Sequence, residues 1–301
     1  MDRVVLKPTH VLPLERRRKK NKPHNILKGA LVVIIASVLT TLAIHASDSF
    51  RNPGSVLSAG VGWSGVREHC PSDMAYITNA GGGYCIDRYE ESADAKCQRP
   101  KPANQFDTEI NITDVACLPL SVKGNTPWVN VALHEALAIC AKAGKRLPSN
   151  KEWYRAALGT PDRVDGSDTS CALGHIGQTQ ADMTGAHTSC ISSYGVFDMV
   201  GNVWEWVDGE VDNGVYGNHE LPSEGYVSEV DVDGVPTKIA TSSDPAFGED
   251  YLFIDKSGLH GMIRGGFWSL KEKAGIYDVN ATIPPTFIGN AVGFRCAKDA
   301  Q

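Results

Sequence analysis

Residues 194–206 read Tyr-Gly-Val-Phe-Asp-Met-Val-Gly-Asn-Val-Trp-Glu-Trp. Trp204 and Trp206 alternate here with Val203 and Glu205, and two large aromatics on one short segment are typical of core packing rather than of a ligand site. Farther along the chain, Arg264 directly precedes two glycines, and Arg295 lies two residues after Gly293. Arginine next to glycine predicts buried guanidinium groups bonded to backbone carbonyls where chain segments approach closely. These residues are expected to hold loops together and need not be catalytic.

Two helices precede this stretch. Residues 131–143 have apolar side chains at helical spacing, and Gly144 stands where such a helix ends. Ser149 and Glu152 form a capping box for a second helix. Its buried face is expected to contain Trp153, Ala156 and Ala157.

Short alternating segments predict antiparallel hairpins at two places. One joins residues 74–77 to 84–89 across a glycine-rich turn, and the other joins 227–232 to 236–240 across Asp-Gly. Residues 159–194, rich in Gly, Ser, Thr and Asp, predict loops.

Charge divides the chain into unlike parts. The whole sequence of 301 residues has a formal charge of -6. Residues 1–28 hold nine basic and two acidic side chains, which leaves the remainder at -13 and argues against a nucleic-acid-binding body. Twelve carboxylates crowd residues 208–261, which are expected to form an acidic insertion, mostly a solvated surface.

An apolar segment separates the basic residues 1–28 from the acidic remainder of the chain. Residues 29–46 carry no formal charge apart from His45, and about 20 such residues cross a bilayer. We expect a basic cytoplasmic tail (1–28), a transmembrane helix (29–46), a linker (47–69) and an extracytoplasmic domain (70–301). This orientation follows because lysines and arginines that flank a transmembrane helix stay on its cytoplasmic side. The protein would then be a single-pass protein of the cell membrane. A cleaved signal peptide is the alternative.

All eight cysteines lie beyond the apolar segment, as expected for a disulfide framework in an exported domain. Proximity in sequence suggests pairing Cys171 with Cys190, Cys70 with Cys85, and Cys97 with Cys117.

Four segments together resemble the formylglycine-generating enzyme, or sulfatase-modifying factor, family. They are Ala143-Gly-Lys-Arg-Leu-Pro148 with Glu152-Trp153, the stretch 194–206, Arg264-Gly-Gly-Phe-Trp268 and Gly293-Phe-Arg-Cys296. The resemblance spans roughly residues 70–298 and implies an α+β fold of the C-type-lectin-like kind, with two helices, small antiparallel sheets and much irregular structure.

The resemblance also implies two structural features. The family's disulfide between the first helix and the C-terminal segment corresponds to Cys140 and Cys296. Its calcium site corresponds to the side chains of Asp198 and Glu205 and the carbonyls of Gly201 and Val203, which are hard oxygen ligands. The alternative is that these two carboxylates only cap turns.

The sequence departs from the family at the copper site. The positions of the two copper-binding cysteines correspond here to Leu270 and Gly275. Neither side chain can bind Cu(I), which prefers soft thiolate ligands. We therefore expect no copper and no formylglycine generation.

The last forty residues resemble the variable region of lectin-fold proteins diversified by retroelements. In that resemblance, Gly265, Gly266, Trp268, Pro284 and residues 293–295 belong to a constant frame. Mixed aromatic and short polar residues between them suit protein or glycan recognition. The candidate ligand-binding residues are Phe267, Trp268, Ser269, Leu270, Tyr277, Asp278, Asn280, Thr282, Phe287, Ile288 and Asn290. The alternative is that these are ordinary loop residues.

The sequence thus predicts a membrane-anchored lectin-like domain that binds a protein or glycan ligand without chemistry. The rival hypothesis is an enzyme of the same family that acts on an exported peptide or small molecule by a copper-independent route. A purely structural envelope protein is a third.

Overall fold

The computed structural model describes residues 70–79, 82–162, 170–174 and 178–300. They fall within one compact unit, Arg67–Gln301. The expected tail, transmembrane helix and linker lie outside the described residues. Within the described ranges, no helix has the length and apolar character needed to cross a bilayer.

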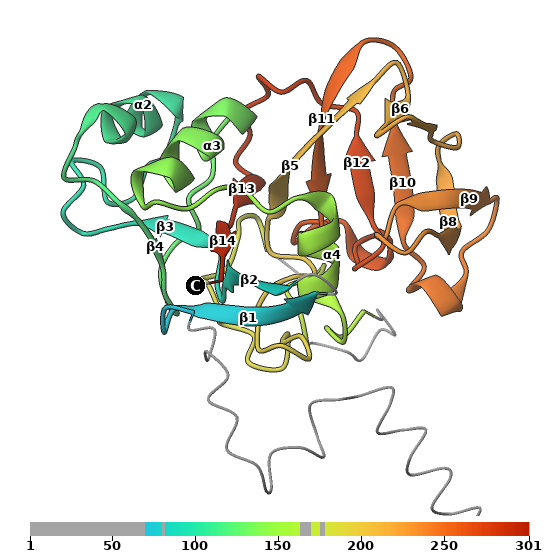
Figure 1. Ribbon diagram of the computed structural model, residues 1–301, viewed down its shortest axis with the longest axis horizontal. Coiled ribbons are helices and arrows are strands. Elements are labelled where there is room, and N and C mark those ends of the chain that lie inside the picture. The colour runs from blue at the N-terminus through green and yellow to red at the C-terminus, as the bar shows by residue number, and fades with distance from the viewer. Residues whose placement is uncertain (1–69, 80–81, 163–169, 175–177, 301) are drawn as a thin grey trace, which may run out of the picture. The chain divides into compact units, whose positions relative to one another are not determined.

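A nine-stranded sheet dominates the domain (Figure 1). Its strand order is β7-β6-β5-β11-β12-β10-β8-β9, and β13 pairs in parallel with β5. β10 and β12 are also parallel, and the remaining pairs are antiparallel. The strands are β5 (Trp204–Asp212), β6 (Val215–Tyr216), β7 (His219–Glu220), β8 (Gly225–Val230), β9 (Pro236–Ala240), β10 (Tyr251–Ile254), β11 (Leu259–Arg264), β12 (Val279–Ala281) and β13 (Val292–Phe294).

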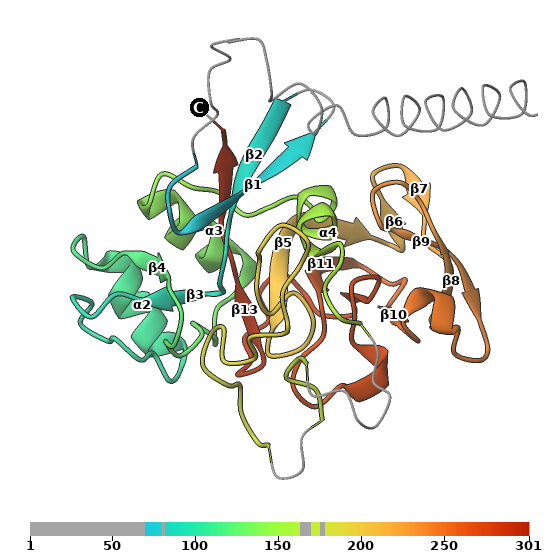
Figure 2. The same cartoon turned by 90° about the horizontal axis from the view of Figure 1, so that it is seen from below.

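The remaining strands form two smaller sheets. β1 (Met74–Asn79) and β2 (Gly82–Asp87) form the first expected hairpin, to which β14 (Ala297–Asp299) adds antiparallel to β2. β3 (Glu91–Ala93) pairs with β4 (Pro119–Ser121). In Figure 2, β13 and β14 follow one another, so the C-terminal segment links the large sheet to the hairpin sheet.

Both expected helices are present. α3 is Leu133–Lys142, and α4 is Asn150–Ala157 with the predicted capping box of Ser149 and Glu152. A third helix, α2 (Gln105–Thr113), was not expected. Its buried residues are the polar Thr108 and Asn111, so the sequence shows no apolar helical stripe there. Two 3₁₀ turns, η1 (Pro245–Phe247) and η2 (Lys271–Lys273), lie in loops.

The acidic stretch 208–261 differs from expectation. It supplies most of the large sheet, including the expected second hairpin, β8 and β9. Apolar side chains along it are buried in the main core, namely Val211, Leu221, Val227, Val235, Leu252 and Ile254. Most residues of the stretch are nevertheless exposed or half-buried, because the carboxylates, apart from buried Asp250, lie in turns and on exposed faces between these short apolar strands.

Two apolar clusters form the core. The first joins α4, the hairpin sheet and one face of the large sheet, with Trp153 at its centre. The second joins α3 to the opposite face through Trp128, Trp206 and Phe294. Trp206 is fully buried and its indole N–H donates to the carbonyl of Val131 at 2.8 Å. The core role expected for residues 194–206 is confirmed.

Candidate functional site

Arg295 and Glu205 form a buried ion pair where β13 and β5 run side by side. Arg295 Nε lies 2.6 Å from Glu205 Oε2, and Nη2 lies 2.5 Å from Oε1. The indole N–H of Trp153 donates to the same Oε2 at 2.7 Å. Arg295 is 0% exposed and Glu205 is 1% exposed. Both carboxylate oxygens of Glu205 therefore accept from charged or indole donors inside the core.

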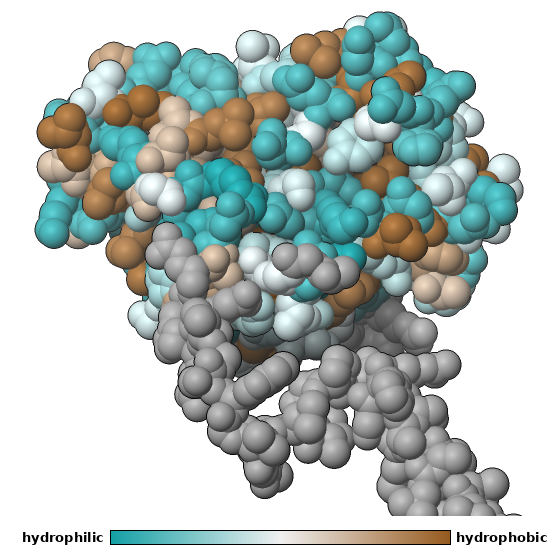
Figure 3. Space-filling view, viewed as in Figure 1, coloured by the Kyte–Doolittle hydropathy of each residue, from teal (hydrophilic) through white to brown (hydrophobic). Residues whose placement is uncertain are grey.

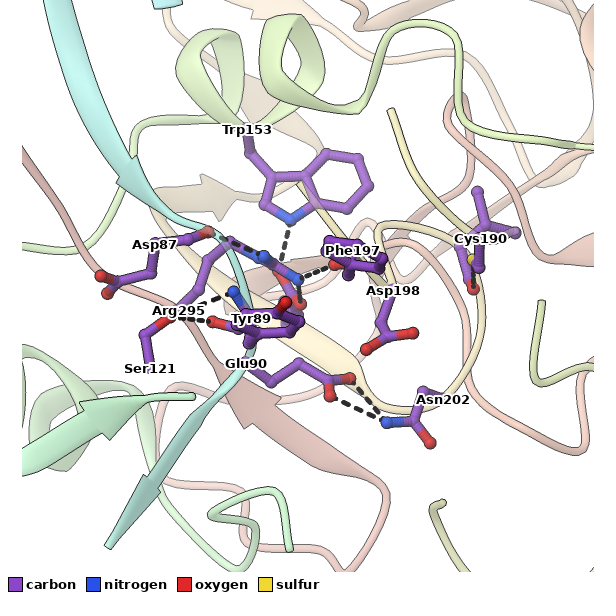
Figure 4. A network of polar contacts seen from close by, with 12 residues as sticks. Asp87, Tyr89, Glu90, Ser121, Trp153, Cys190, Phe197, Asp198, Asn202 and Arg295 are labelled. Atoms are coloured by element: carbon purple, nitrogen blue, oxygen red, sulfur yellow. Dashed lines mark hydrogen bonds and ion pairs between the residues drawn. The ribbon is translucent and has the colours of Figure 1, made fainter. Parts of the chain in front are cut away.

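The same guanidinium also holds backbone segments together (Figure 4). Arg295 donates to the carbonyls of Asp87 at 3.0 Å and Phe197 at 2.9 Å. It thus joins the end of β2 to the 194–206 segment. Arg264 acts alike, donating to the carbonyls of Gly234 and Ile276. The expectation that these arginines bond carbonyls between closely approaching segments is confirmed.

Two more carboxylates stand beside this pair, as Figure 4 shows. Glu90 accepts from the amide nitrogen of Asn202 at 3.0 and 2.8 Å. Asp198 Oδ2 accepts from the Gly185 N–H at 2.6 Å. Burial raises the pKa of Glu90 well above its ordinary value, and the charge of Asp198 raises it further. Burial likewise raises the pKa of Asp198 to about 6.

This arrangement bears on the expected calcium ligands. Both oxygens of Glu205 accept from Arg295 and Trp153, whereas the hydrogen bonds that the described residues make to Asp198 and the neighbouring Glu90 come from neutral amide donors. Three buried carboxylates face one guanidinium, so the cluster has an excess of two negative charges when all are ionised. Hard, anionic oxygens of this kind fit Ca²⁺. Asp198 and Glu90 would then hold the ion, and its chemistry would be structural.

Sequence reasoning missed Glu90 and Asn202. Glu90 comes from the loop after β2, more than one hundred residues before Asp198. No short motif connects them, because only the folded chain brings the two carboxylates together.

Calcium is therefore expected to stabilise the chain, and a chelator should lower its melting temperature. The stabilisation should fade as the pH falls through about 6, because the raised pKa of Asp198 lets a proton compete with the cation there. Thermal unfolding at pH 7.5 and pH 5, with and without Ca²⁺, checks this. Asp198→Asn is the matched variant, and an unchanged response to chelator in the native chain would remove Asp198 from the site.

The candidate ligand-binding residues do not share one environment. Trp268 is 5% exposed and Asp278 is 0% exposed. The ring of Tyr277 packs between Tyr154 and Phe247 on the side of the first core cluster. The other eight are half-buried or exposed: Phe267, Ser269, Leu270, Asn280, Thr282, Phe287, Ile288 and Asn290.

Of these eight, Phe267 and Leu270 pack against the second core cluster. Asn280 Oδ1 accepts from both the backbone and the hydroxyl of Thr282, which fixes the end of β12. Residues 284–290 then lie over the start of α3, where Pro285 and Gly289 accept from Leu133 and Asn130.

Two surface hollows contain none of these candidates. One, of about 230 Å³, is lined in part by Ser92, Lys101, Asn125 and Met183. The other, of about 270 Å³, lies at the start of α4 and is lined in part by Asn150, Tyr216, His219 and Asp233.

All four expected disulfides are present: Cys70–Cys85, Cys97–Cys117, Cys140–Cys296 and Cys171–Cys190. They use every cysteine of the chain, so no free thiol remains. At the two positions that correspond to copper ligands, Leu270 is half-buried and Gly275 is buried. A thiolate copper site has no ligands here.

Comparisons with known proteins agree with this architecture. The chain is 27% identical over 210 residues to the formylglycine-generating enzyme of Mycobacterium tuberculosis, covering 60% of this chain and 59% of that protein. It is 34% identical over 95 residues to the inactive C-alpha-formylglycine-generating enzyme 2 of Bos taurus, covering 27% and 32%. It thus spans less than two thirds of either relative.

A solved structure of Treponema denticola variable protein 1 is also similar, at 14% identity and a TM-score of 0.43, covering 77% of this chain and 93% of that one. The family model of the sulfatase-modifying factor enzyme 1-like domain matches residues 107–300, which is more than half of the sequence. The chain therefore belongs to the sulfatase-modifying factor family and has its α+β, lectin-like fold.

Proposed function

We propose that this chain is a membrane-anchored, extracytoplasmic member of the family that binds a protein or glycan ligand and does not generate formylglycine. The observation that carries the proposal is the state of the cysteines. Every one is held in a disulfide, and the two copper-ligand positions are Leu270 and Gly275. Oxidation of a substrate thiol on Cu(I) has no protein ligands to support it.

Support for the membrane anchor comes from the sequence. Residues 29–46 are apolar, and basic residues precede them while an acidic body follows. Four disulfides are consistent with an oxidising compartment.

Support for binding comes from the exposed loops after β11 and β12. Phe287 is 37% exposed on the segment that lies over α3, with Ile288 and Asn290 beside it. An exposed aromatic among short polar residues, held on a rigid disulfide-braced scaffold, is the composition of many recognition surfaces.

Replacing Phe287 with Ser is expected to weaken ligand binding at least tenfold without changing thermal stability by more than a few degrees. The full chain, labelled and in detergent, is applied to a glycan array and to a panel of purified surface proteins. Phe106→Ser is the matched control, because Phe106 is 66% exposed on α2, in the region where Figure 3 shows apolar residues over α2 and α3. Loss of binding in the Phe106 variant alone would place the ligand on α2 instead.

The alternative is an enzyme that works without copper. The similarity to the mycobacterial formylglycine-generating enzyme and the buried carboxyls with raised pKa values favour it. Incubation of the full chain with a Cys-containing peptide, with and without copper, separates the two hypotheses. Turnover that persists without copper would support the enzyme, and copper-dependent turnover would overturn both.

A further inference from the structure

Two aspartates from distant parts of the chain converge on Gly275, and a third, Asp278, is buried nearby with its backbone N–H donating to the Gly275 carbonyl. Asp162 follows α4, Asp250 directly precedes β10, and Asp278 directly precedes β12. β10 and β12 are parallel neighbours with Leu252 opposite Val279. The topology therefore places Asp250 and Asp278 side by side, at the N-terminal ends of two neighbouring parallel strands.

The distances around Gly275 show how closely two of these carboxylates approach. A β-carbon built on Gly275 would lie 2.0 Å from Asp162 Oδ1 and 2.0 Å from Asp250 Oδ1. The two oxygens are thus at most about 4 Å apart, which suits two ligands that each contact one cation at about 2.3–2.6 Å. Neighbouring backbone groups fix the other oxygens, since Ile276 N–H donates to Asp162 Oδ2 and Tyr277 N–H donates to Asp250 Oδ2.

Several atoms of this cluster have no partner among the described residues. Asp250 and Asp278 are both 0% exposed. Asp162 Oδ1, Asp250 Oδ1 and both oxygens of Asp278 are buried and accept no hydrogen bond. Leaving buried polar atoms unsatisfied is costly, and carboxylates more so. The unpartnered Oδ1 atoms of Asp162 and Asp250, at most about 4 Å apart, therefore point to a missing positive partner, and Asp278 adds two more unpartnered oxygens nearby.

The charges nearby support a divalent ion. Arg264 is fully buried, and its charge lowers the pKa values of Asp250 and Asp278, but it does not reach either carboxylate as an ion pair. Lys273 also lowers the pKa of Asp278. Burial nevertheless raises the pKa of Asp162 to about 8 and those of the other two well above their ordinary values. When all three aspartates are ionised, they exceed the charge of Arg264 by two and the combined charge of Arg264 and Lys273 by one.

We propose that Asp162 and Asp250 bind one hard divalent cation, such as Ca²⁺, beside Gly275, with Asp278 adding negative charge from nearby. This site is separate from the carboxylates at Asp198 and is independent of what the chain binds or catalyses. It also explains Gly275, since any side chain there would collide with the two converging oxygens. At the position that corresponds to a copper-ligating cysteine, the chain thus has room for a cation held by oxygen.

The test measures metal content and stability together. The full chain is purified in detergent without chelator, dialysed, and its bound Ca²⁺, Mg²⁺ and Mn²⁺ are measured by mass spectrometry. Asp250→Asn is expected to lose one equivalent of metal, whereas Glu229→Gln, a control at an exposed carboxylate paired with Lys238, retains it. Asp162→Asn is the second variant, for use if Asp250→Asn does not fold.

Thermal unfolding supplies a readout that a purely structural aspartate would not give. In chelator, Asp250→Asn is expected to melt at or above the native temperature, because it relieves repulsion between carboxylates. With millimolar Ca²⁺ the order reverses, because the native chain gains several degrees more than the variant, which keeps only the response of the site at Asp198. Equal metal content in the native and variant chains, or a variant less stable by the same amount in both conditions, overturns the proposal. The three carboxyls would then be neutralised by shared protons.

Discussion

Replacing Arg295 with Met is expected to destabilise the folded domain by about 3–5 kcal/mol, which is the usual cost of removing one partner of a buried ion pair. The reason is specific to this core. Arg295 donates to both oxygens of Glu205 and to two backbone carbonyls from other segments. Without it, Glu205 remains buried beside Asp198 and Glu90 with no guanidinium to offset its charge. Chemical denaturation of the disulfide-intact chain measures the loss.

A second substitution tests the cause. Glu205→Gln in the Arg295→Met background removes one of the stranded charges, and it should recover part of the lost stability. Arg146→Met is the control for a pair that solvent screens. Arg146 lies 2.7 Å from Glu152, but its side chain is 39% exposed, so its removal should cost no more than about 1 kcal/mol. Equal losses for Arg295 and Arg146 would contradict the role assigned to the buried pair.

The helices and hairpins were predictable because their signals are local. Ser149 and Glu152 cap α4 as their spacing of three indicates, and Asp233-Gly234 turns β8 into β9. α2 was missed because it buries Thr108 and Asn111 instead of an apolar stripe. Thr108 accepts from the indole N–H of Trp128 at 3.1 Å, so this helix is anchored by a polar contact that periodicity cannot show.

The site was predictable only where one motif contains the residues. Asp198 and Glu205 lie in a single stretch, and both are buried in one cluster as expected of neighbours in a core segment. Glu90 and the three aspartates around Gly275 come from separate loops. The juxtaposition of Asp250 with Asp278 depends on the parallel pairing of β10 with β12, which no local pattern encodes.

Opening the Cys140–Cys296 bridge by replacing both cysteines with Ser is expected to cost up to about 5 kcal/mol, by the loop-length dependence of chain entropy. The bridge joins α3 to the residue after Arg295 and spans 156 residues. Both sulfurs are fully buried. Equilibrium unfolding of the double variant, compared with the native chain under non-reducing conditions, gives the difference.

The Cys97–Cys117 bridge provides the internal comparison, because it closes only 20 residues and should contribute about 3 kcal/mol by the same dependence. The stability lost with the Cys140–Cys296 bridge should exceed that lost with the Cys97–Cys117 bridge for a second reason. The Cys296 backbone N–H donates to buried Asp87, and Arg295 beside it holds Glu205, so loosening the C-terminal strand also exposes the ion pair to water. The loss of the long bridge should therefore couple to Arg295→Met: the triple variant should lose less than the separate effects predict. Strict additivity would mean that the disulfide and the ion pair stabilise the C-terminal segment independently.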